Sequence, residues 1–410
     1  MSQVGQIVIV GASLAGLRAA ETLRASGYDG IVTLIGAEPH MPYDRPPLSK
    51  QFLKGDWDAE RISLRRPDQY EPLQLDFHLG VAAKQLDPVG KTVTMVNGDV
   101  VPFDGCIIAT GTAARRLPFG HDLDGVHTLR TLDDAVALRD ALDHGARLAI
   151  VGAGFIGSEV ASTARGKGCD VTVFEAAPVP LARVLGPVMG AALGALHEPN
   201  GTRLQLNANI TGFASTGAHR VAGVRLADGA IVEADAVVVG VGSQPVTGWL
   251  EGSGLTLRDG IVCDMMLHAV GAPGVFAAGD VCRWPDGRRH GAEARLEHWT
   301  NASEQGAAAA KNLLAYLAGG AGEPFCPVPF VWSDQYGSRI QFLGHSSADD
   351  DVAVVRGAVA DGKFVAVYGR GGVLVGALGV NMPKDLMGFR KLLAADSPTT
   401  FAEVVAAATP

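Results

Sequence analysis

The chain has 410 residues, of which 47% are hydrophobic, and its formal net charge is −9. This length exceeds what one hydrophobic core usually supports, so two or three domains are expected. No block of Lys or Arg accompanies the acidic balance, which argues against a nucleic-acid partner. The first residues, MSQVGQIVIVG, lack the basic start of a signal peptide, and no uncharged run is long enough to cross a membrane. We therefore expect a cytoplasmic protein.

The five cysteines are scattered, and none forms a C-x-x-C pair. An odd number at irregular spacing argues against a disulfide framework and against a zinc site. We therefore expect buried or half-buried thiols and no bound metal. The cysteines are Cys106, Cys169, Cys263, Cys282 and Cys326.

An internal repeat organises the chain. Residues 7–38 and residues 148–177 each read as an apolar strand, a Gly-rich turn, a helix of small and apolar residues, a Gly and a second apolar strand. This pattern is typical of one βαβ unit, used here twice.

The remaining segments predict further elements between and after the repeats. Short strands are expected over 75–103 and 203–242, buried strands ending in Gly or Gly-Asp over 104–113 and 273–281, and helices over 298–318 and near 384–394. The order indicates a nucleotide unit, an inserted nucleotide domain, a return to the first domain and a C-terminal domain. The predicted boundaries are 1–113, 114–240, 241–322 and 323–410.

The Gly-rich turn of the second repeat is Gly152-Ala153-Gly154-Phe155-Ile156-Gly157. The first Gly allows the tight turn, the second lets backbone approach a pyrophosphate, and the third lets the helix pack on the strand. The pyrophosphate would lie at the helix N-terminus, where free N–H groups favour negative charge. The second strand ends at Glu175, close to the spacing of about 20 residues expected for the ribose-binding acid. The turn therefore predicts a dinucleotide site.

The turn of the first repeat is Gly11-Ala12-Ser13-Leu14-Ala15-Gly16. Ser13 replaces the middle Gly, and backbone approach still fits if its φ stays negative. Gly36 aligns with Glu175, and Glu38 follows two residues later. This turn alone is weaker support for a dinucleotide site than the second one.

Two further segments relate the repeats to a known superfamily. Ala109-Thr110-Gly111 closes one strand, and Gly279-Asp280 closes another. With them the chain resembles the two-dinucleotide flavoprotein reductases, which are glutathione-reductase-like. The resemblance implies an α/β fold with two Rossmann-like dinucleotide-binding domains, for FAD and for NAD, plus a C-terminal α+β domain. It also implies that Asp280 meets the flavin ribitol, whereas the alternative interpretation of Asp280 is an ordinary strand-end cap.

The segment Tyr43–Lys50, within PYDRPPLSK, contains no cysteine, which excludes thiol relay chemistry there. Together with HTLRTLDDA around Arg130, the EHW triplet 297–299 and VWSDQ at 331–335, it resembles the bacterial ferredoxin reductases of aromatic-ring dioxygenase and cytochrome monooxygenase systems. Putidaredoxin reductase and the rubredoxin reductases are relatives in that family. The resemblance implies FAD, NADH and a two-iron two-sulfur ferredoxin or a rubredoxin-like carrier as acceptor. It also suggests a monomer or weak homodimer.

Positions carried over from the family place Arg45 and Lys50 beside the flavin, with Lys50 paired to Glu159 near the nicotinamide. Trp332 would face the isoalloxazine, and Lys50, Glu159 and Trp332 are the candidate catalytic residues. Ala37 stands where the family usually has Asp, so Glu38 is the substitute for the ribose contact. The remaining cofactor-binding candidates are Gly11, Ser13, Leu14, Ala15, Gly16, Ala83 and His298 (both mainly through backbone), Ala109, Thr110, Gly111, Arg130, Gly152, Gly154, Phe155, Ile156, Gly157, Glu175, Arg183, Gly242, Gly279, Asp280, Glu297 and Trp299.

Several alternatives stay open from the sequence. Lys50 is also consistent with a surface lysine, Glu159 with a helix-surface acid and Trp332 with a core aromatic. Two other functions compete with ferredoxin reduction: an NADH oxidase or quinone-type reductase, and a binding flavoprotein like apoptosis-inducing factor.

The carboxylate of Glu175 favours NADH over NADPH, although Arg183 nearby would soften that preference. An acidic ferredoxin would need a basic docking patch on an acidic reductase. The candidates for such a patch are Arg339, Lys384, Arg390 and Lys391, with Arg288 and Arg289 weaker.

Overall fold

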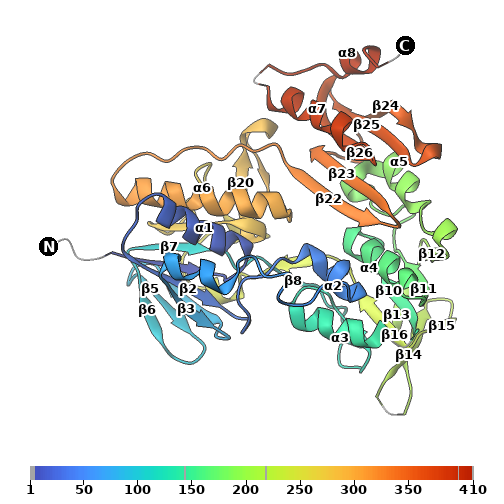
Figure 1. Ribbon diagram of the computed structural model, residues 1–410, viewed down its shortest axis with the longest axis horizontal. Helices are drawn as coiled ribbons and strands as arrows, with labels where there is room; N and C mark the ends of the chain where they lie inside the picture. The colour runs from blue at the N-terminus through green and yellow to red at the C-terminus, as the bar shows by residue number, and fades with distance from the viewer. Residues whose placement is uncertain (1–4, 143–144, 218, 396, 409–410) are drawn as a thin grey trace. The chain divides into compact units, whose positions relative to one another are not determined.

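The computed structural model describes residues 5–142, 145–217, 219–395 and 397–408 (Figure 1). The chain divides into two compact units by its internal contacts, and each is described separately. Unit 1 comprises Met1–Asp44, Ala59–Ala113 and Gln244–Pro327, and unit 2 comprises Arg45–Asp58, Ala114–Ser243 and Val328–Pro410. The division into four segments stays a prediction.

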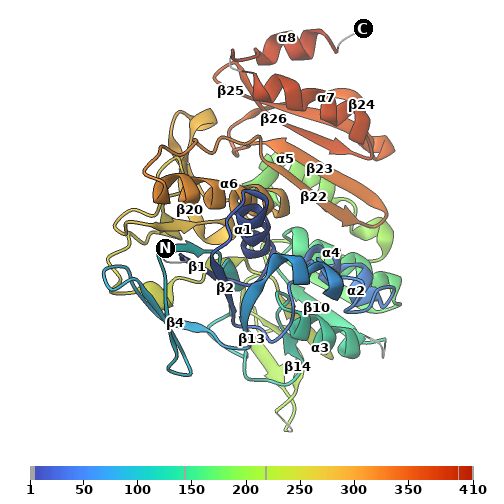
Figure 2. The same cartoon turned by 60° about the vertical axis from the view of Figure 1, so that its left-hand side comes forward.

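Unit 1 is built on a parallel sheet of five strands in the order β19-β7-β1-β2-β3. Its strands are β1 (Gln6–Val10), β2 (Ile31–Gly36), β3 (Leu75–Leu79), β7 (Gly105–Ile108) and β19 (Val275–Ala277). The helices of the unit are α1 (Leu14–Ala25) and α6 (Trp299–Leu317), which lie side by side in Figures 1 and 2.

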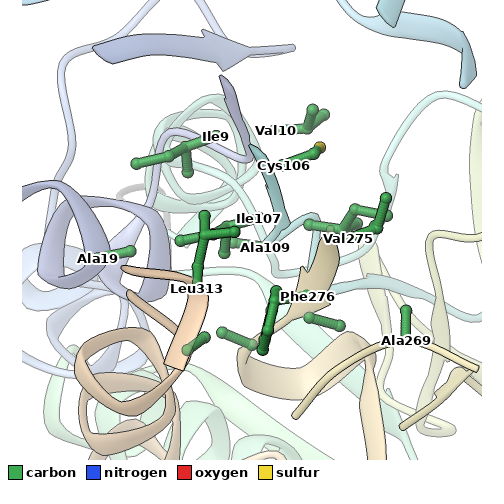
Figure 3. Close-up of a cluster of buried hydrophobic side chains, with 14 of the residues drawn as sticks. Ile9, Val10, Ala19, Cys106, Ile107, Ala109, Ala269, Val275, Phe276 and Leu313 are labelled. Atoms are coloured by element: carbon green, nitrogen blue, oxygen red, sulfur yellow. The ribbon is translucent and has the colours of Figure 1, made fainter. Parts of the chain in front are cut away.

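The core of unit 1 lies around the central strands (Figure 3). Ile9 of β1, Ile107 of β7 and Leu313 of α6 are fully buried. Parallel strands covered on their faces need near-continuous apolar sequence, which explains the runs IVIV and CII. Helices α1 and α6 approach closely because Gly306 has no side chain: a Cβ there would lie 2.3 Å from the carbonyl oxygen of Ala15.

Shorter strands complete unit 1. The antiparallel sheet β4-β5-β6 contains Ala83–Asp87, Thr92–Met95 and Val100–Pro102, and a second small sheet contains β18 (Ile261–Val262), β20 (Cys282–Asp286) and β21 (Ala292–Ala294). Strands β8 (Thr112–Ala114) and β17 (Ser243–Pro245) each contain one of the points where the chain passes from one unit to the other.

The nucleotide part of unit 2 repeats the architecture with a parallel sheet in the order β12-β11-β10-β16-β9. Its strands are β9 (Val126–His127), β10 (Arg147–Val151), β11 (Asp170–Phe174), β12 (Arg203–Gln205) and β16 (Ala236–Val239). Its helices are α2 (Gln51–Lys54), α3 (Leu132–Leu142), α4 (Phe155–Gly166) and α5 (Ala182–Gly194). An antiparallel sheet adds β13 (Ile210–Ser215), β14 (Val221–Leu226) and β15 (Ile231–Glu233).

The C-terminal part of unit 2 is an antiparallel sheet in the order β22-β23-β26-β25-β24. Its strands are β22 (Phe330–Gln335), β23 (Ser338–Gly344), β24 (Asp351–Ala358), β25 (Lys363–Arg370) and β26 (Val373–Val380). Helix α7 (Pro383–Ala394) packs on this sheet through the buried Leu386, and α8 (Phe401–Ala406) follows (Figure 2). The hydroxyl of Tyr368 on β25 donates to the carbonyl oxygen of Leu185 on α5 at 2.9 Å, which joins the sheet to the nucleotide part.

The predicted α/β architecture with a C-terminal α+β part is confirmed, and so are both βαβ units and the helices expected over 298–318 and 384–394. The structure adds α3, α5 and α8, which the sequence pattern did not predict. Within the described ranges, no helix combines the length and apolar character needed to cross a membrane.

Candidate functional site

The first Gly-rich turn connects β1 to α1 with a backbone that only glycine fits at two positions. Gly11 has φ +126°, and a Cβ there would lie 2.1 Å from the carbonyl oxygen of Ala109. A Cβ on Gly16 would lie 2.0 Å from the carbonyl oxygen of Gly11. Ser13 has φ −130° and ψ −160°, an extended conformation that any residue adopts. The serine therefore leaves the turn intact.

Three segments of unit 1 meet beside this turn. Strand β7 ends at Ile108, and the N–H of Ala278 donates to its carbonyl oxygen at 2.9 Å. The hydroxyl of Thr112 donates to Oδ2 of Asp280 at 3.3 Å, which brings the Ala109–Gly111 segment next to the Gly279-Asp280 turn. These predicted residues, far apart in sequence, therefore lie together.

The end of β2 carries the candidate ribose contact. Ala37 is exposed, and Oε2 of the half-buried Glu38 accepts a hydrogen bond from the hydroxyl of Tyr43 at 2.5 Å. The N–H of Val81 donates to the carbonyl oxygen of Gly36 at 3.0 Å, so the segment leading to the predicted Ala83 runs beside this strand end. Glu38 is thus a carboxylate at the edge of the first turn.

Helix α6 begins immediately after Glu297-His298, and Nε1 of Trp299 donates to Asp44 at 2.6 Å. Six residues further along the helix, Gln305 accepts the N–H of Gly279 at 2.8 Å through its side-chain oxygen. Oδ1 of Asn301 and Nε2 of Gln305 are buried and have no hydrogen-bond partner among the described residues. Buried polar atoms are normally paired, so these two atoms indicate that unit 1 holds a polar ligand here.

Unit 1 fits FAD on these observations. The turn Gly11–Gly16 opens onto the apolar first turn of α1, whose N–H groups favour a pyrophosphate. The carboxylate of Glu38 suits a ribose, and the Gly279-Asp280 turn with its neighbouring unpaired amide atoms suits the polar chain of the flavin.

The second turn repeats the geometry of the first in unit 2. Gly152 has φ +104°, and a Cβ there would lie 2.3 Å from the carbonyl oxygen of Gly240. A Cβ on Gly157 would lie 2.1 Å from the carbonyl oxygen of Gly152. At Gly154 a Cβ would meet nothing within 4 Å, so open space lies over the start of α4. Ile156, in the first helical turn, is 46% exposed.

Glu175 directly follows β11, and backbone N–H groups hold its carboxylate in place. Its two carboxylate oxygens accept the N–H groups of Ala153 and Ala177, each at 2.9 Å. This fixes the acid at the edge of the turn, as a ribose contact requires. Arg183 is exposed in the first turn of α5, and Gly242, with φ +100°, follows β16.

Glu159 on helix α4 forms a buried ion pair with Lys50. Nζ of Lys50 is 2.7 Å from Oε2 of Glu159, and the two side chains are only 11% and 7% exposed. The interpretations as a solvated surface lysine and a helix-surface acid are therefore wrong. The hydroxyls of Ser49 and Ser333 also donate to Glu159, at 2.5 and 2.6 Å. Sequence reasoning missed both serines, because they lie 110 and 174 residues away from Glu159.

Trp332 is half-buried on β22, and its ring stacks on Phe330 with centroids 6.1 Å apart. The guanidinium of Arg339 lies 5.5 Å from the Trp332 ring, and it also pairs with Asp334 at 2.7 Å. The predicted Arg45 and Arg130 contact each other in unit 2: Nη1 of Arg45 donates to the carbonyl oxygen of Arg130 at 2.5 Å.

The cysteines are thiols, four of them buried and Cys326 half-buried, as expected. Sequence spacing gave no sign that Cys263 and Cys282 lie together, yet their sulfurs are 3.7 Å apart in the core of unit 1. Hydrogen bonding to Cys282 and burial raise the pKa of Cys263, which disfavours the reactive thiolate.

Two families of sequences match the chain. The family described as pyridine nucleotide-disulphide oxidoreductase matches residues 5–306, and the one described as reductase C-terminal matches residues 330–410.

Several curated proteins similar to the chain are named as reductases, some of them as components of dioxygenase systems. Rhodocoxin reductase of Rhodococcus erythropolis is 39% identical over 96% of this chain and 90% of its own length. The biphenyl dioxygenase system ferredoxin–NAD(+) reductase component of Paraburkholderia xenovorans (strain LB400) is 38% identical over 89% of this chain and 86% of its own.

Solved structures agree over almost the whole chain. Putidaredoxin reductase in its covalent complex with putidaredoxin matches with a TM-score of 0.91 and 30% identity, over 98% of this chain and 99% of that one. The ferredoxin reductase for the CYP199A2 system from Rhodopseudomonas palustris matches with a TM-score of 0.91 and 33% identity, over 98% and 97%.

Proposed function

The chain belongs to the pyridine nucleotide-disulphide oxidoreductase family, and on that premise we propose that it transfers electrons from NADH through FAD to a small ferredoxin that serves an oxygenase. One observation carries the proposal. Two dinucleotide turns occur in a chain whose segment after the first turn offers Lys50 in a buried ion pair instead of a redox cysteine. Relatives named as ferredoxin–NAD(+) reductase components support the same acceptor.

FAD, when bound, supplies the conversion between a two-electron donor and a one-electron acceptor. The first turn and the N-terminus of α1 would hold its pyrophosphate, Glu38 its ribose, and Asp280 with the neighbouring amides its polar chain. The roles of Ala83, Arg45, Arg130, His298 and Trp332 toward the flavin stay proposals from the resemblance.

NADH would bind at the second turn. The open space over Gly154 would admit its pyrophosphate to the N-terminus of α4, and the fixed carboxylate of Glu175 would accept from a free ribose 2′-hydroxyl. The task of the protein is to orient the nicotinamide, because hydride transfer depends mainly on positioning. Lys50 and Glu159 remain the residues that we propose to act near the reacting ring.

The acceptor is proposed to be a two-iron two-sulfur ferredoxin, with a rubredoxin-like carrier as the alternative. We propose a cytoplasmic monomer or weak homodimer. On α7, Lys384 and Lys391 are both exposed, as a docking patch for an acidic carrier would require. Arg339 is a poorer member of that patch, because its charge already pairs with Asp334.

The decisive experiment compares acceptors. Purified protein loaded with FAD should reduce an added two-iron ferredoxin with NADH rapidly, and oxygen or quinone alone slowly. Fast turnover with oxygen or quinone would support an oxidase or quinone reductase. Slow turnover with every acceptor, together with a change in partner binding on reduction, would support a signalling flavoprotein.

A second experiment locates the docking patch. Reversing Lys384 and Lys391 to Glu should weaken ferredoxin reduction, and the loss should shrink as salt screens the field. Ferricyanide reduction, which needs no docking, is the control. Normal ferredoxin turnover of the double variant at low salt would place the docking surface elsewhere.

A further inference from the structure

The carboxylate of Glu159 joins three segments of unit 2. Oε2 accepts from Ser49 at 2.5 Å and lies 2.7 Å from Nζ of Lys50, both in the segment Arg45–Asp58. Oε1 accepts from the hydroxyl of Ser333 on β22 at 2.6 Å. Glu159 itself is on α4, four residues after Phe155 at its start. A change at any one of these groups therefore acts on the other two segments.

In the hydrogen bond between β22 and Glu159, the hydroxyl of Ser333 is the donor and the carboxylate is the acceptor. Nε2 of Gln335 donates to the oxygen of Ser333 at 3.0 Å, so the one hydroxyl hydrogen of Ser333 is donated in a hydrogen bond to Oε1 of Glu159. Ser333 is fully buried and Gln335 is 1% exposed, so water does not compete for these bonds. In a low-dielectric interior such a chain of hydrogen bonds is strong and geometrically specific.

Ser333 is the neighbour of Trp332, and the two side chains leave opposite faces of the strand because side chains alternate along β-strands. On one face Ser333 is held by Glu159, and on the other Trp332 lies between Phe330 and Arg339. The hydrogen bond of Ser333 therefore ties the residue next to Trp332 directly to Glu159.

We propose that Ser333 is a positioning residue, which acts through Glu159 to hold Trp332 and the Lys50–Glu159 pair in one arrangement for the reaction with NADH. The link to that reaction rests on the proposed function. The link between Ser333, Glu159 and Trp332 does not, and it can be measured without NADH or ferredoxin.

The test uses Ser333→Ala, Glu159→Gln and the double variant in the full-length protein. Ser162→Ala is the matched control, because the Ser162 hydroxyl oxygen accepts the N–H of Tyr336 at 2.7 Å. That bond joins the same helix to the same hairpin without involving Glu159.

The first measurement is fluorine NMR of protein containing 5-fluorotryptophan, with the Trp332 signal assigned by Trp332→Phe. Ser333→Ala should move the Trp332 signal, and the double variant should match Glu159→Gln alone. Ser162→Ala should move it much less. A Trp332 signal that is unchanged in Ser333→Ala, or that moves equally in Ser162→Ala, would overturn the proposal, since loosening of the hairpin would then explain the effect.

The second measurement is the limiting rate of flavin bleaching by NADH in stopped flow. We expect a loss of about tenfold in Ser333→Ala, smaller than the roughly 100-fold that a misplacement of about 1 Å can cost, with FAD content unchanged. The loss should not add to that of Glu159→Gln. Additive losses would contradict action through Glu159, and so would a normal rate. If no variant, nor the unaltered protein, reacts with NADH while the fluorine shifts appear as expected, the proposed function fails and the positioning link stands.

Discussion

The two Gly-rich turns of this chain share a backbone but differ in what surrounds it. Gly11 and Gly152 have φ values of +126° and +104°, and added Cβ atoms would lie 2.1 and 2.3 Å from carbonyl oxygens of a neighbouring strand end. Gly16 and Gly157 would clash equally with the first Gly of their own turn. The strand-turn-helix geometry is therefore fixed by sterics alone and carries no information about which nucleotide binds.

The differences lie at the middle position and at the second strand. Ser13 occupies the place where Gly154 leaves open space. The acid of the first unit, Glu38, bonds to a tyrosine side chain, whereas both oxygens of Glu175 are fixed by backbone N–H groups. On the proposed assignment, the turn that carries the Ser13 side chain holds FAD, and the turn with open space at Gly154 binds NADH.

Helices α1 and α4 also differ in the side chain at the fifth residue of each helix. Aligning the repeats places Arg18 of α1 opposite Glu159 of α4. The Arg18 side chain is 39% exposed and pairs with Glu21, which also pairs with Arg65, while Glu159 is buried with Lys50. At this matching position the second unit therefore places a charged pair inside the protein, whereas the first unit places a partly exposed arginine there.

The largest expected effects come from the first glycines. Gly11→Ala and Gly152→Ala each force an L side chain into positive φ, which costs about 1–3 kcal/mol in strain alone, and each adds a steric clash. We expect Gly11→Ala to lose FAD, measured by flavin absorbance. We expect Gly152→Ala to keep FAD and lose NADH-driven turnover.

The control is Gly166→Ala, in α4, where a Cβ meets nothing within 4 Å. It should behave like the unaltered protein. If Gly152→Ala also lost its flavin, or Gly11→Ala kept it, the assignment of one nucleotide to each turn would be wrong.

These turns were also the most predictable part of the chain. A positive φ and a close approach demand glycine, and the apolar strands before them repeat with a clear pattern, so the sequence predicted both βαβ units. Helix α5 escaped prediction because Gly186 and Pro187 interrupt its pattern, and Gly186 indeed has φ +72°.

The polar cluster on Glu159 was predictable only in part. The pair with Lys50 followed from the resemblance, but Ser49 and Ser333 are common residues with no distinguishing spacing. Tertiary packing brings them together, and no local rule of helix or strand encodes such a contact. The same holds for Cys263, which follows β18, and Cys282, which begins the paired strand β20.

The second prediction compares the charged pairs. Lys50→Met leaves Glu159 buried without its cation, and removing one partner of a buried pair typically costs about 3–5 kcal/mol. We expect a lower melting temperature, retained FAD and slower flavin bleaching by NADH. Arg18→Met removes a partly exposed cation and leaves Glu21 paired with Arg65, so a loss of about 0–1 kcal/mol is expected, and the bleaching rate should stay unchanged. If flavin bleaching by NADH were equally fast in Lys50→Met and Arg18→Met, Lys50 would have no part in the reaction with NADH.

The third prediction concerns the acids that end the second strands. The carboxylate of Glu175 should repel a 2′-phosphate by about 1–4 kcal/mol at near 4 Å in a solvated site. We therefore expect kcat/KM to favour NADH over NADPH by about tenfold or more. Glu175→Gln should narrow that ratio, because it keeps a hydrogen-bonding group and removes the charge.

Glu38→Gln is the matched variant in the first unit. It should leave the NADH to NADPH ratio unchanged, because Glu38 belongs to the turn assigned to FAD. A ratio near one in the unaltered protein would contradict the argument, and Arg183 would then be the first residue to test.

The smallest effects should come from exchanging the middle residues of the turns. Ser13→Gly removes a side chain from a backbone that is already extended, so it should keep FAD and lose only about 0.4–1 kcal/mol of stability through unfolded-state entropy. Gly154→Ser fits the extended backbone at φ −76° and should fold normally. Its hydroxymethyl group enters the open space over α4, so KM for NADH should rise a few-fold, by less than about 1 kcal/mol. Thermal melting, flavin content and steady-state kinetics check these expectations. If Gly154→Ser abolished NADH use as completely as Gly152→Ala, the middle position of the turn would control access of NADH more strongly than the shared backbone does. A side chain at that position would then weaken NADH binding far more than the few-fold effect that we expect.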